Sequence, residues 1–360
     1  MVEGRPCLET LVSKLPDILE HFQIAGGPFR WAELDSFDDR NLRVTLEGGT
    51  YVVKAHNGLL PSGSLERLQA QDQLITRLRE QGLPVPDVLR SWENCSTFQL
   101  EAPLSRGLCL VRVLSYLEGV TIKNDTPKSP QFLRALGALC GRTQLALDGF
   151  DAEGFHWTWD WDMKCVPQVV RSKLHHLTSE RRNLAQRLCD GYAEALSEER
   201  VSKLPHSVLH ADLNDTNLLF ESDGSDAPAL AGILDFGDSI YSCRIFEPAI
   251  AAGYFSLCQA DPVMVLQEVL RGYLEKVPWE IAEDEVLAYF HAARGRILLS
   301  VAFAAENSQL EPDNEYLAHT SEPGWAVLMA LDNDLAIQGL HEVAREVAGK
   351  KVIGCRWNGK

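Results

Sequence analysis

Two short polar motifs in the second half of the chain have residue types and spacing that suit phosphoryl transfer. The first, HADLNDTN, occupies residues 210–217, and the second, ILDFGD, occupies residues 233–238. Asp212 is the candidate catalytic residue, because a carboxylate can orient an acceptor hydroxyl and take its proton. Asn217 and Asp235 are the candidate metal ligands, since amide and carboxylate oxygens are hard ligands of the kind that Mg²⁺ binds. The pattern predicts transfer of a phosphoryl group from a nucleotide to an alcohol.

The combination of the two motifs is more informative than either one. Asn, Asp and Thr are common in turns, so residues 210–217 alone could form an ordinary surface turn. Asp235, however, follows Asn217 by 18 residues and comes directly after the apolar segment 230–234. Two such motifs at this spacing, each beside an apolar segment, favour an active site over a chance pair of turns.

Lys54 is the candidate residue for binding the phosphates of the nucleotide. It follows the apolar run 51–53, in the position of a strand lysine that pairs with α- and β-phosphates. A partner for it is expected on the following helix, where Glu66 lies early, Asp72 is short and Gln71 is neutral. Gln71 could hold Lys54 through a hydrogen bond, and the sequence leaves the choice among the three open.

The segment before Lys54 carries no glycine-rich phosphate loop. Residues 35–41 read DSFDDRN instead. Ser36 and Asn41, together with backbone N–H groups, could cover the phosphates from a turn. Because Ser, Asp and Asn favour turns in any case, a capped turn without a ligand is the alternative.

The elements that must position these residues change in type near residues 114–119. The earlier part of the chain predicts short strands at 44–46, 51–55, 97–100 and 108–114, and a helix at 64–81. The later part predicts helices at 130–147, 180–196, 246–259, 262–274, 282–305 and 324–344. The predicted fold is α+β and bilobal, like a protein kinase, with a β-rich N-lobe (1–113), a connector (114–119) and a helical C-lobe (120–360). A nucleotide is expected in the cleft between the lobes.

Composition and charge argue against several other classes of protein. The chain has 360 residues with 34 basic and 51 acidic side chains, a net charge of −17. This balance argues against nucleic-acid binding and is compatible with a cationic small substrate. The nine cysteines are an odd number without a C-x-x-C pair, which argues against a disulfide framework and a zinc site. With no long apolar run and no secretory signal, we expect a cytoplasmic protein that needs neither a membrane nor an obligate protein partner.

Four segments together resemble the aminoglycoside phosphotransferase / choline kinase family: residues 36–41, 51–54, 210–217 and 233–238. Within this family the resemblance is strongest to the hydroxylysine kinases, in segments 157–167, 232–250 and 309–324. The resemblance covers most of the chain, from Leu34 to Ala330. It implies phosphorylation of 5-hydroxy-L-lysine to 5-phosphooxy-L-lysine in hydroxylysine catabolism, with GTP (or ATP) as co-substrate and Mg²⁺ as the metal.

A substrate with two ammonium groups and one carboxylate needs charged residues in its pocket. Asp238, Glu247 and Asp162 are the candidates to bind the ammonium groups. The tryptophans of segment 157–161 could also attract an ammonium, with packing as their alternative role. Glu247 could instead be a helix-start carboxylate that the helix dipole favours. Arg296 is the candidate for the substrate carboxylate, which a guanidinium can bind through two hydrogen bonds.

Two other functions are compatible with these residues. The same fold and mechanism could serve another acceptor, namely choline, ethanolamine, homoserine or an aminoglycoside. A catalytically inactive kinase fold that only binds ligands is the other, and the presence of Asp212, Asn217 and Asp235 argues against it. Mg²⁺-dependent nucleotide turnover separates the inactive fold from an enzyme, and a panel of acceptors separates hydroxylysine from the other amino alcohols.

Overall fold

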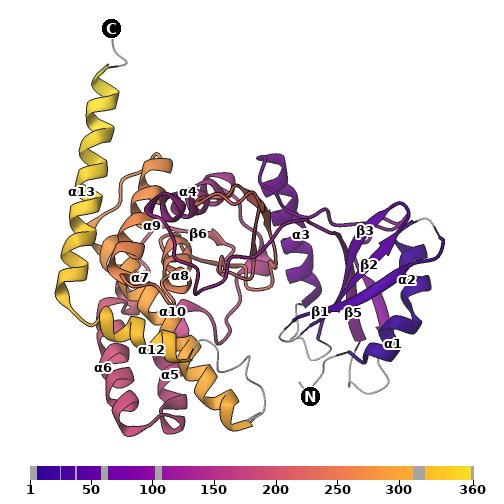
Figure 1. Ribbon diagram of the computed structural model, residues 1–360, viewed down its shortest axis with the longest axis horizontal. Coiled ribbons are helices and arrows are strands. Elements are labelled where there is room, and N and C mark those ends of the chain that lie inside the picture. The colour runs from indigo at the N-terminus through magenta and orange to yellow at the C-terminus, as the bar shows by residue number, and fades with distance from the viewer. Residues whose placement is uncertain are drawn as a thin grey trace. The chain divides into compact units, whose positions relative to one another are not determined.

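The computed structural model describes residues 6–24, 26–36, 39–57, 64–101, 108–310 and 321–357 (Figure 1). The chain divides into two compact units. Unit 1 consists of the residues up to Glu118 with the short segments 152–154 and 231–234, and unit 2 consists of the remainder. The motif residues 210–217 and 235–238 therefore belong to unit 2, whereas Lys54 belongs to unit 1.

A five-stranded antiparallel sheet in the order β1-β2-β3-β5-β4 forms the centre of unit 1. Its strands are β1 (Arg30–Leu34), β2 (Arg40–Leu46), β3 (Gly49–Ala55), β4 (Phe98–Glu101) and β5 (Leu108–Ser115). The helices in the described part of this unit are α1 (Leu8–Ser13), α2 (Leu15–His21) and α3 (Ser64–Glu80). The predicted strands at 44–46 and 51–55 lie within β2 and β3, which pair with each other, and α3 matches the predicted helix 64–81 to within one residue.

The two faces of this sheet carry different side chains, because successive residues of a strand point to opposite faces. Apolar residues of β3 and β5 pack with α1 and α2 in one core: Val53, Ala55, Val111 and Val113. Lys54 and Arg112 alternate with these residues and lie opposite each other in the pairing of β3 with β5. Figure 1 shows α3 on the opposite side of the sheet from α1 and α2. The polar residues of unit 1 therefore face α3.

Unit 2 is mainly helical. The described α-helices of this unit are α4 (Pro130–Ala146), α5 (Val166–Lys173), α6 (Ser179–Ala195), α7 (Glu198–Val201), α8 (Phe246–Phe255), α9 (Pro262–Lys276), α10 (Glu283–Leu310), α12 (Ser321–Ala330) and α13 (Asp334–Trp357). Unit 2 also contains the short 3₁₀ turns η2 (Met163–Cys165) and η3 (Leu174–His176), whereas the turn η1 (Glu153–Phe155) begins in segment 152–154 of unit 1. The helix α10 contacts α5, α6, α8, α12 and α13 and so forms the centre of the unit. By length and composition α10 could cross a membrane, but 78% of its most apolar window is buried, as in the core helix of a folded domain.

Two small sheets hold the motif loops. The strands are β6 (His206–Leu209), β7 (Leu218–Phe220), β8 (Leu230–Ile233) and β9 (Ile240–Cys243). β6 pairs with β9, with Leu209 opposite Ile240, and β7 pairs with β8. The first motif follows β6 and the second leads into β9. Because β6 and β9 are neighbours, Asp212 and Asp238 extend from adjacent strand ends.

The structure differs from the sequence prediction in a few elements. The hydrophobic pattern does not predict β1, α1, α2 or α5, which are short. The predicted helix 324–344 is wrong in its continuity, because it is interrupted between α12 and α13. The break has a local cause: the side chain of Asn333 accepts a hydrogen bond from the backbone N–H of Ala336 at 3.1 Å and so begins a new helix.

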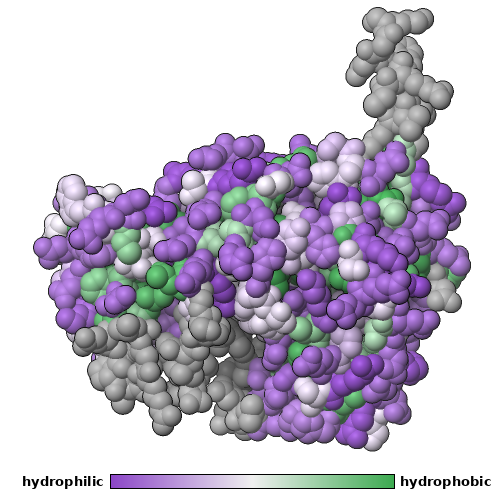
Figure 2. All heavy atoms as spheres, turned by 180° about the vertical axis from the view of Figure 1, so that it is seen from behind, coloured by the Kyte–Doolittle hydropathy of each residue, from purple (hydrophilic) through white to green (hydrophobic). Residues whose placement is uncertain are grey.

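The side of the molecule drawn in Figure 2 exposes mainly hydrophilic residues, and its hydrophobic residues form small separate patches. The excess of acidic over basic residues, 51 against 34, accounts for a charged surface of this kind. Small apolar patches of this kind are ordinary on folded proteins.

Candidate active site

The loop after β6 is held in a strained backbone conformation by the side chain of Glu247. Ala211 has a φ of 65°, in the left-handed region that residues other than glycine seldom adopt. Glu247, in the first turn of α8, accepts hydrogen bonds from the backbone N–H groups of His210 (2.6 Å) and Ala211 (3.2 Å). The side chain of Glu247 is completely buried. It therefore anchors the loop to α8.

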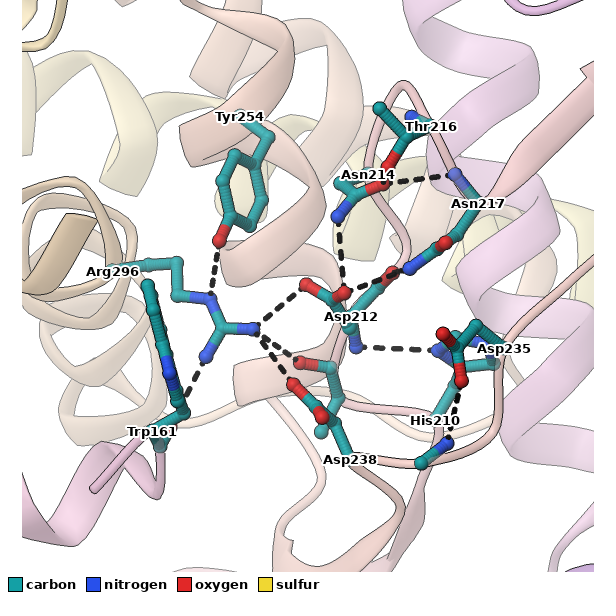
Figure 3. A network of polar contacts seen from close by, with 12 residues as sticks. Trp161, His210, Asp212, Asn214, Thr216, Asn217, Asp235, Asp238, Tyr254 and Arg296 are labelled. Carbon is teal, nitrogen blue, oxygen red and sulfur yellow. Dashed lines mark hydrogen bonds and ion pairs between the residues drawn. The ribbon is translucent and has the colours of Figure 1, made fainter. Parts of the chain in front are cut away.

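Asp212 lies at the centre of the polar network drawn in Figure 3. Its Oδ1 accepts a hydrogen bond from Arg296 Nη2 at 2.8 Å. Its Oδ2 accepts from Asn214 Nδ2 at 3.0 Å and from Asn217 Nδ2 at 2.7 Å. Asn214 Oδ1 in turn accepts from the backbone N–H of Asn217 at 2.9 Å, which closes the loop. Donors on both oxygens fix the plane of the Asp212 carboxylate, and two of the predicted site residues, Asp212 and Asn217, are in direct contact.

Asn217 and Asp235 present oxygen atoms that suit a metal ion. Asn217 donates through Nδ2 to Asp212, which directs its Oδ1 away from that residue. Asp235 has a φ of 51°, and its Oδ1 accepts from the backbone N–H of Gly237 at 3.1 Å. Among the described residues, no three His, Cys, Asp or Glu side chains form a metal site by themselves. Mg²⁺ needs only one or two protein carboxylates when phosphates supply further oxygens, so these residues fit a metal bound together with a nucleotide.

Arg296, on α10, is 1% exposed, and each of its three side-chain nitrogens donates a hydrogen bond. The acceptors are Tyr254 Oη for Nε (3.1 Å), the Trp161 carbonyl for Nη1 (3.1 Å) and, for Nη2, the Ala211 carbonyl (3.1 Å), Asp212 Oδ1 (2.8 Å) and Asp238 Oδ2 (3.5 Å). The sequence predicts that Arg296 binds the substrate carboxylate; in the structure its guanidinium binds acceptors of the protein itself. Acceptors of the protein itself surround the guanidinium, which extends from α10 toward Asp212 and Asp238 (Figure 3).

Burial and charge act together on Asp238 and Arg296. Burial raises the pKa of Asp238 well above its usual value, and the neighbouring Asp212 adds to this effect. Burial alone would lower the pKa of Arg296, but Tyr254, Asp212 and Asp238 raise it above its ordinary value. The side chains of Asp212 and Asp238 keep 18% and 23% of their surface exposed. A ligand can therefore reach both acids, whereas the arginine between them is enclosed.

Two acids predicted to bind the substrate, Glu247 and Asp162, bind backbone N–H groups in the structure. Burial raises the pKa of Glu247 to about 7, although its hydrogen bonds from the backbone of the catalytic loop oppose the shift. Asp162 is 4% exposed, and its Oδ1 accepts from the backbone N–H of Lys164 at 2.9 Å, which caps the turn η2. Burial raises the pKa of Asp162 as well. Of the three predicted ammonium ligands, Asp238 alone keeps an accessible side chain.

In unit 1, Lys54 pairs with an acid that the sequence prediction does not include. Its Nζ lies 3.2 Å from Asp39 Oδ2, and the same oxygen lies 3.2 Å from His56 Nδ1. Asp39 Oδ1 accepts from the backbone N–H of Asn57 at 3.0 Å. Burial alone would raise the pKa of Asp39, but Lys54 and His56 lower it well below its usual range. Asp39 is therefore an ionised partner of Lys54.

Gln71 and Asp72, two of the predicted candidates to hold Lys54, both bind Arg112. Arg112 Nη2 donates to Gln71 Oε1 at 2.9 Å, Nη1 donates to Asp72 Oδ1 at 3.0 Å, and Nε donates to His56 Nε2 at 3.1 Å. These side chains are all at most 5% exposed. The longer, forked arginine next to Lys54 reaches α3, and a continuous set of contacts runs from α3 through Arg112 and His56 to the ion pair of Lys54.

Asn41 and Ser36, the other predicted phosphate-binding residues, lie on β2 and just before it. Asn41 is opposite Lys54 in the pairing of β2 with β3. Its Oδ1 is buried and has no hydrogen-bond partner among the described residues. A buried amide oxygen without a partner, beside a lysine, is a position that a ligand with a hydrogen-bond donor can complete. Residues 37 and 38 lie outside the described residues, so the phosphate-covering turn stays a prediction.

Sequence reasoning missed five residues of these networks: Asp39, His56, Arg112, Asn214 and Tyr254. Two of them have a signal in the sequence, because Asp39 and Asn214 stand inside the segments already singled out. Arg112 also has one, since it interrupts the apolar strand LCLVRVL and a charge there must find partners. His56 and Tyr254 stand out only once the fold brings their partners near.

A family model described as the phosphotransferase enzyme family (APH) matches residues 31–326. The chain belongs to this phosphotransferase family. The hydroxylysine kinase of Mus musculus is 30% identical over 337 residues, which cover 88% of this chain and 87% of that protein. The homoserine kinase of Zymomonas mobilis is 24% identical over 274 residues, which cover 73% and 76%.

Solved structures of two small-molecule kinases have the same fold. A microcompartment-associated aminopropanol kinase superposes with a TM-score of 0.70 at 15% identity and covers 91% of this chain and 99% of its own. Amicoumacin kinase, in complex with AMP-PNP, Ca²⁺ and its ligand, gives a TM-score of 0.64 at 15% identity, with coverage of 90% and 96%. The predicted kinase-like fold, with an antiparallel sheet and a mainly helical part, is confirmed. So is the prediction of a small-molecule phosphotransferase that acts on an alcohol group.

Proposed function

We propose that this phosphotransferase transfers the γ-phosphoryl group of GTP (or ATP) to the hydroxyl of 5-hydroxy-L-lysine, giving 5-phosphooxy-L-lysine. The observation that carries the proposal is the fixed carboxylate of Asp212, which is held on both oxygens and still partly exposed. Similarity to hydroxylysine kinases over 88% of the chain supports the choice of acceptor. A cytoplasmic location is the expectation for such an enzyme.

In the proposed reaction, Asp212 orients the acceptor hydroxyl and takes its proton as the oxygen attacks the γ-phosphorus. Asp238 lies close enough to Asp212 to share Arg296 with it, and its exposed carboxyl group can bind an ammonium group of the acceptor. Lys54 and Asn41 in unit 1 contact the phosphates of the nucleotide, with Ser36 as a further donor. Lys54 is oriented for this by Asp39.

Asn217 Oδ1 and the carboxylate of Asp235 are the proposed ligands of Mg²⁺. Their hard oxygens fit this ion, and the hydrogen bonds of Asn217 to Asp212 fix the direction of its amide. When bound, Mg²⁺ neutralises charge on the transferring phosphates. These residues hold the ion and leave the remaining coordination positions to the nucleotide and water.

A second acceptor, homoserine, is supported by the similarity to homoserine kinases from two bacteria. Both acceptors are amino acids with an alcohol, but hydroxylysine carries an additional ammonium group. The accessible Asp238 beside the catalytic carboxylate favours the acceptor with the additional ammonium group, because a bound ammonium stabilises the ionised carboxylate against the burial that raises its pKa.

The test is turnover of a panel of acceptors by the purified protein with Mg²⁺ and either GTP or ATP. We expect 5-hydroxy-L-lysine to give the highest kcat/KM in a panel with homoserine, choline, ethanolamine and kanamycin. Equal values for choline and hydroxylysine would contradict the proposed acceptor. Tight nucleotide binding without turnover of any acceptor would indicate a binding protein in place of an enzyme.

A further inference from the structure

The enclosed guanidinium of Arg296 has a role that neither the motifs nor the proposed substrate requires. It donates hydrogen bonds to three separate parts of unit 2: the catalytic loop, Tyr254 of α8 and the carbonyl of Trp161 (Figure 3). The guanidinium also lies over the Trp161 ring, 4.9 Å from its centroid. Arg296 is thus a buried residue whose side chain is fixed by several hydrogen bonds, and not a surface cation.

The space beside Arg296 is too small for the carboxylate of a substrate. The cavity that it lines with Trp159, Trp161 and Asp238 has a volume of about 10 Å³, which corresponds to about one water molecule. The side chain itself is 2% exposed. A substrate carboxylate could bind there only by displacing acceptors that already satisfy the guanidinium.

Arg296 restrains both the backbone and the side chain at the catalytic position. Its Nη2 binds the carbonyl of Ala211, whose left-handed backbone needs such support, and also Oδ1 of Asp212. Glu247 restrains the same residue at its other end, because its carboxylate accepts a hydrogen bond from the backbone N–H of Ala211. Asn214 and Asn217 donate to Asp212 Oδ2, and Arg296 donates to Oδ1, so Arg296 fixes the orientation of Oδ1.

We propose that Arg296 is a positioning residue for phosphoryl transfer, which orients the Asp212 carboxylate and shares its charge between Asp212 and Asp238. This inference rests on the proposed function, since it assumes that Asp212 faces the acceptor hydroxyl. The sequence predicts the substrate carboxylate as the ligand of Arg296; the proposal assigns the catalytic loop to it.

Steady-state kinetics of Arg296→Lys test the proposal. Lysine keeps the charge but loses the fork, so we expect kcat to fall about 100-fold from the misplaced carboxylate while KM for nucleotide and acceptor stays within about threefold. Arg244→Lys is the matched control, because Arg244 also pairs with a carboxylate (Glu285) and an aromatic ring (Trp279) in unit 2. The control is expected to keep kcat within about twofold. Tyr254→Phe removes one acceptor of Arg296 but leaves its carboxylate partners in place. It should lower kcat by about fivefold, which corresponds to roughly the loss of one hydrogen bond.

An acceptor without a carboxylate separates positioning from substrate binding. With 1,5-diaminopentan-2-ol, which is hydroxylysine lacking its carboxylate, the Arg296→Lys defect in kcat should be as large as with hydroxylysine. A defect that appears as a raised acceptor KM and disappears with this analogue would overturn the proposal. In an Asp212→Asn background, Arg296→Lys should lower kcat by less than about threefold, because the group that it positions is already gone.

The outcome is independent of which acceptor the wild type prefers. If hydroxylysine fails and another amino alcohol is phosphorylated, the proposed function is wrong and the variants are compared on that acceptor. If no acceptor is turned over, the shifts in denaturation midpoint of Arg296→Lys, Asp212→Asn and the double variant decide. Non-additive shifts support the coupling of the two side chains, and additive shifts overturn it.

Discussion

Arg112 in unit 1 and Arg296 in unit 2 are both buried arginines with carboxylate partners, but their other hydrogen-bond acceptors differ. Arg112 lies on a strand, and its recorded hydrogen bonds go to the side chains of Gln71, Asp72 and His56. Arg296 lies on a helix and binds main-chain carbonyls as well as side chains. The first arrangement links α3 to the side chains around Lys54, and the second fixes the path of a loop.

The difference indicates how each unit contributes to the reaction. A network of side chains can transmit the position of a helix to Lys54, which suits the binding of a nucleotide. A network that holds the backbone fixes one carboxylate in space, which suits a chemical step that depends on orientation. We therefore expect changes in the Arg112 network to affect stability and nucleotide KM, and changes in the Arg296 network to affect kcat.

Removal of Arg112 should have the largest effect on stability. In Arg112→Met, Asp72 is left buried without its cation, so the free energy of unfolding should fall by about 3–5 kcal/mol. Denaturation by urea measures this change. The double variant Arg112→Met/Asp72→Leu should recover part of the loss, because it leaves no unpaired charge. A loss below about 1 kcal/mol in the single variant would mean that the network is not coupled to folding.

Glu247 should make the stability of the unit 2 network depend on pH. Its pKa is about 7 in the fold against 4.5 ordinarily, so its stabilising contribution is complete below pH 4.5 and is lost as the pH rises through 7. The stability of the wild type relative to Glu247→Gln should therefore decrease over this range, by up to about 3 kcal/mol at about 1.4 kcal/mol per pKa unit. Urea denaturation of both proteins from pH 4.5 to 8 measures it, and a constant difference would contradict the assignment.

Asp235→Asn should weaken binding of the metal–nucleotide complex. Loss of a charged ligand is expected to reduce affinity for Mg²⁺-nucleotide about 100-fold. Isothermal titration calorimetry at several Mg²⁺ concentrations measures the affinity. Asp223→Asn, at an exposed turn, is the control and should change nothing. Unchanged affinity in Asp235→Asn would remove this residue from the metal site.

Asp39→Asn should have the smallest effect, and one confined to the nucleotide. Lys54 loses its ionised partner, so KM for the nucleotide should rise about tenfold while kcat stays within about threefold. Steady-state kinetics with varied nucleotide measure both constants. A fall in KM would reverse the interpretation, because it would mean that Asp39 competes with the phosphates for Lys54.

Sequence reasoning predicts the contacts that are local in the chain and misses those made by tertiary structure. Asp212 and Asn217 are five residues apart in one loop, so their spacing alone implies their contact. The α3 helix and the β2–β3 hairpin follow from hydrophobic period and turn residues. By contrast, Arg296 lies 84 residues from Asp212, and Arg112 lies 40 residues from Asp72. No local pattern marks such partners, and this is why the sequence does not predict the tertiary contacts of Gln71, Glu247 and Arg296.

The most direct test of the account is the turnover and nucleotide affinity of Asp212→Asn. Asparagine keeps the size of the side chain but cannot take the acceptor proton, so kcat with 5-hydroxy-L-lysine should fall about 1,000-fold. The Kd for Mg²⁺-nucleotide should stay within about threefold of the wild-type value, because Asp235 and Asn217 are unchanged. A variant that keeps a near-normal kcat would contradict the central claim that the carboxylate held by Arg296, Asn214 and Asn217 performs the chemistry.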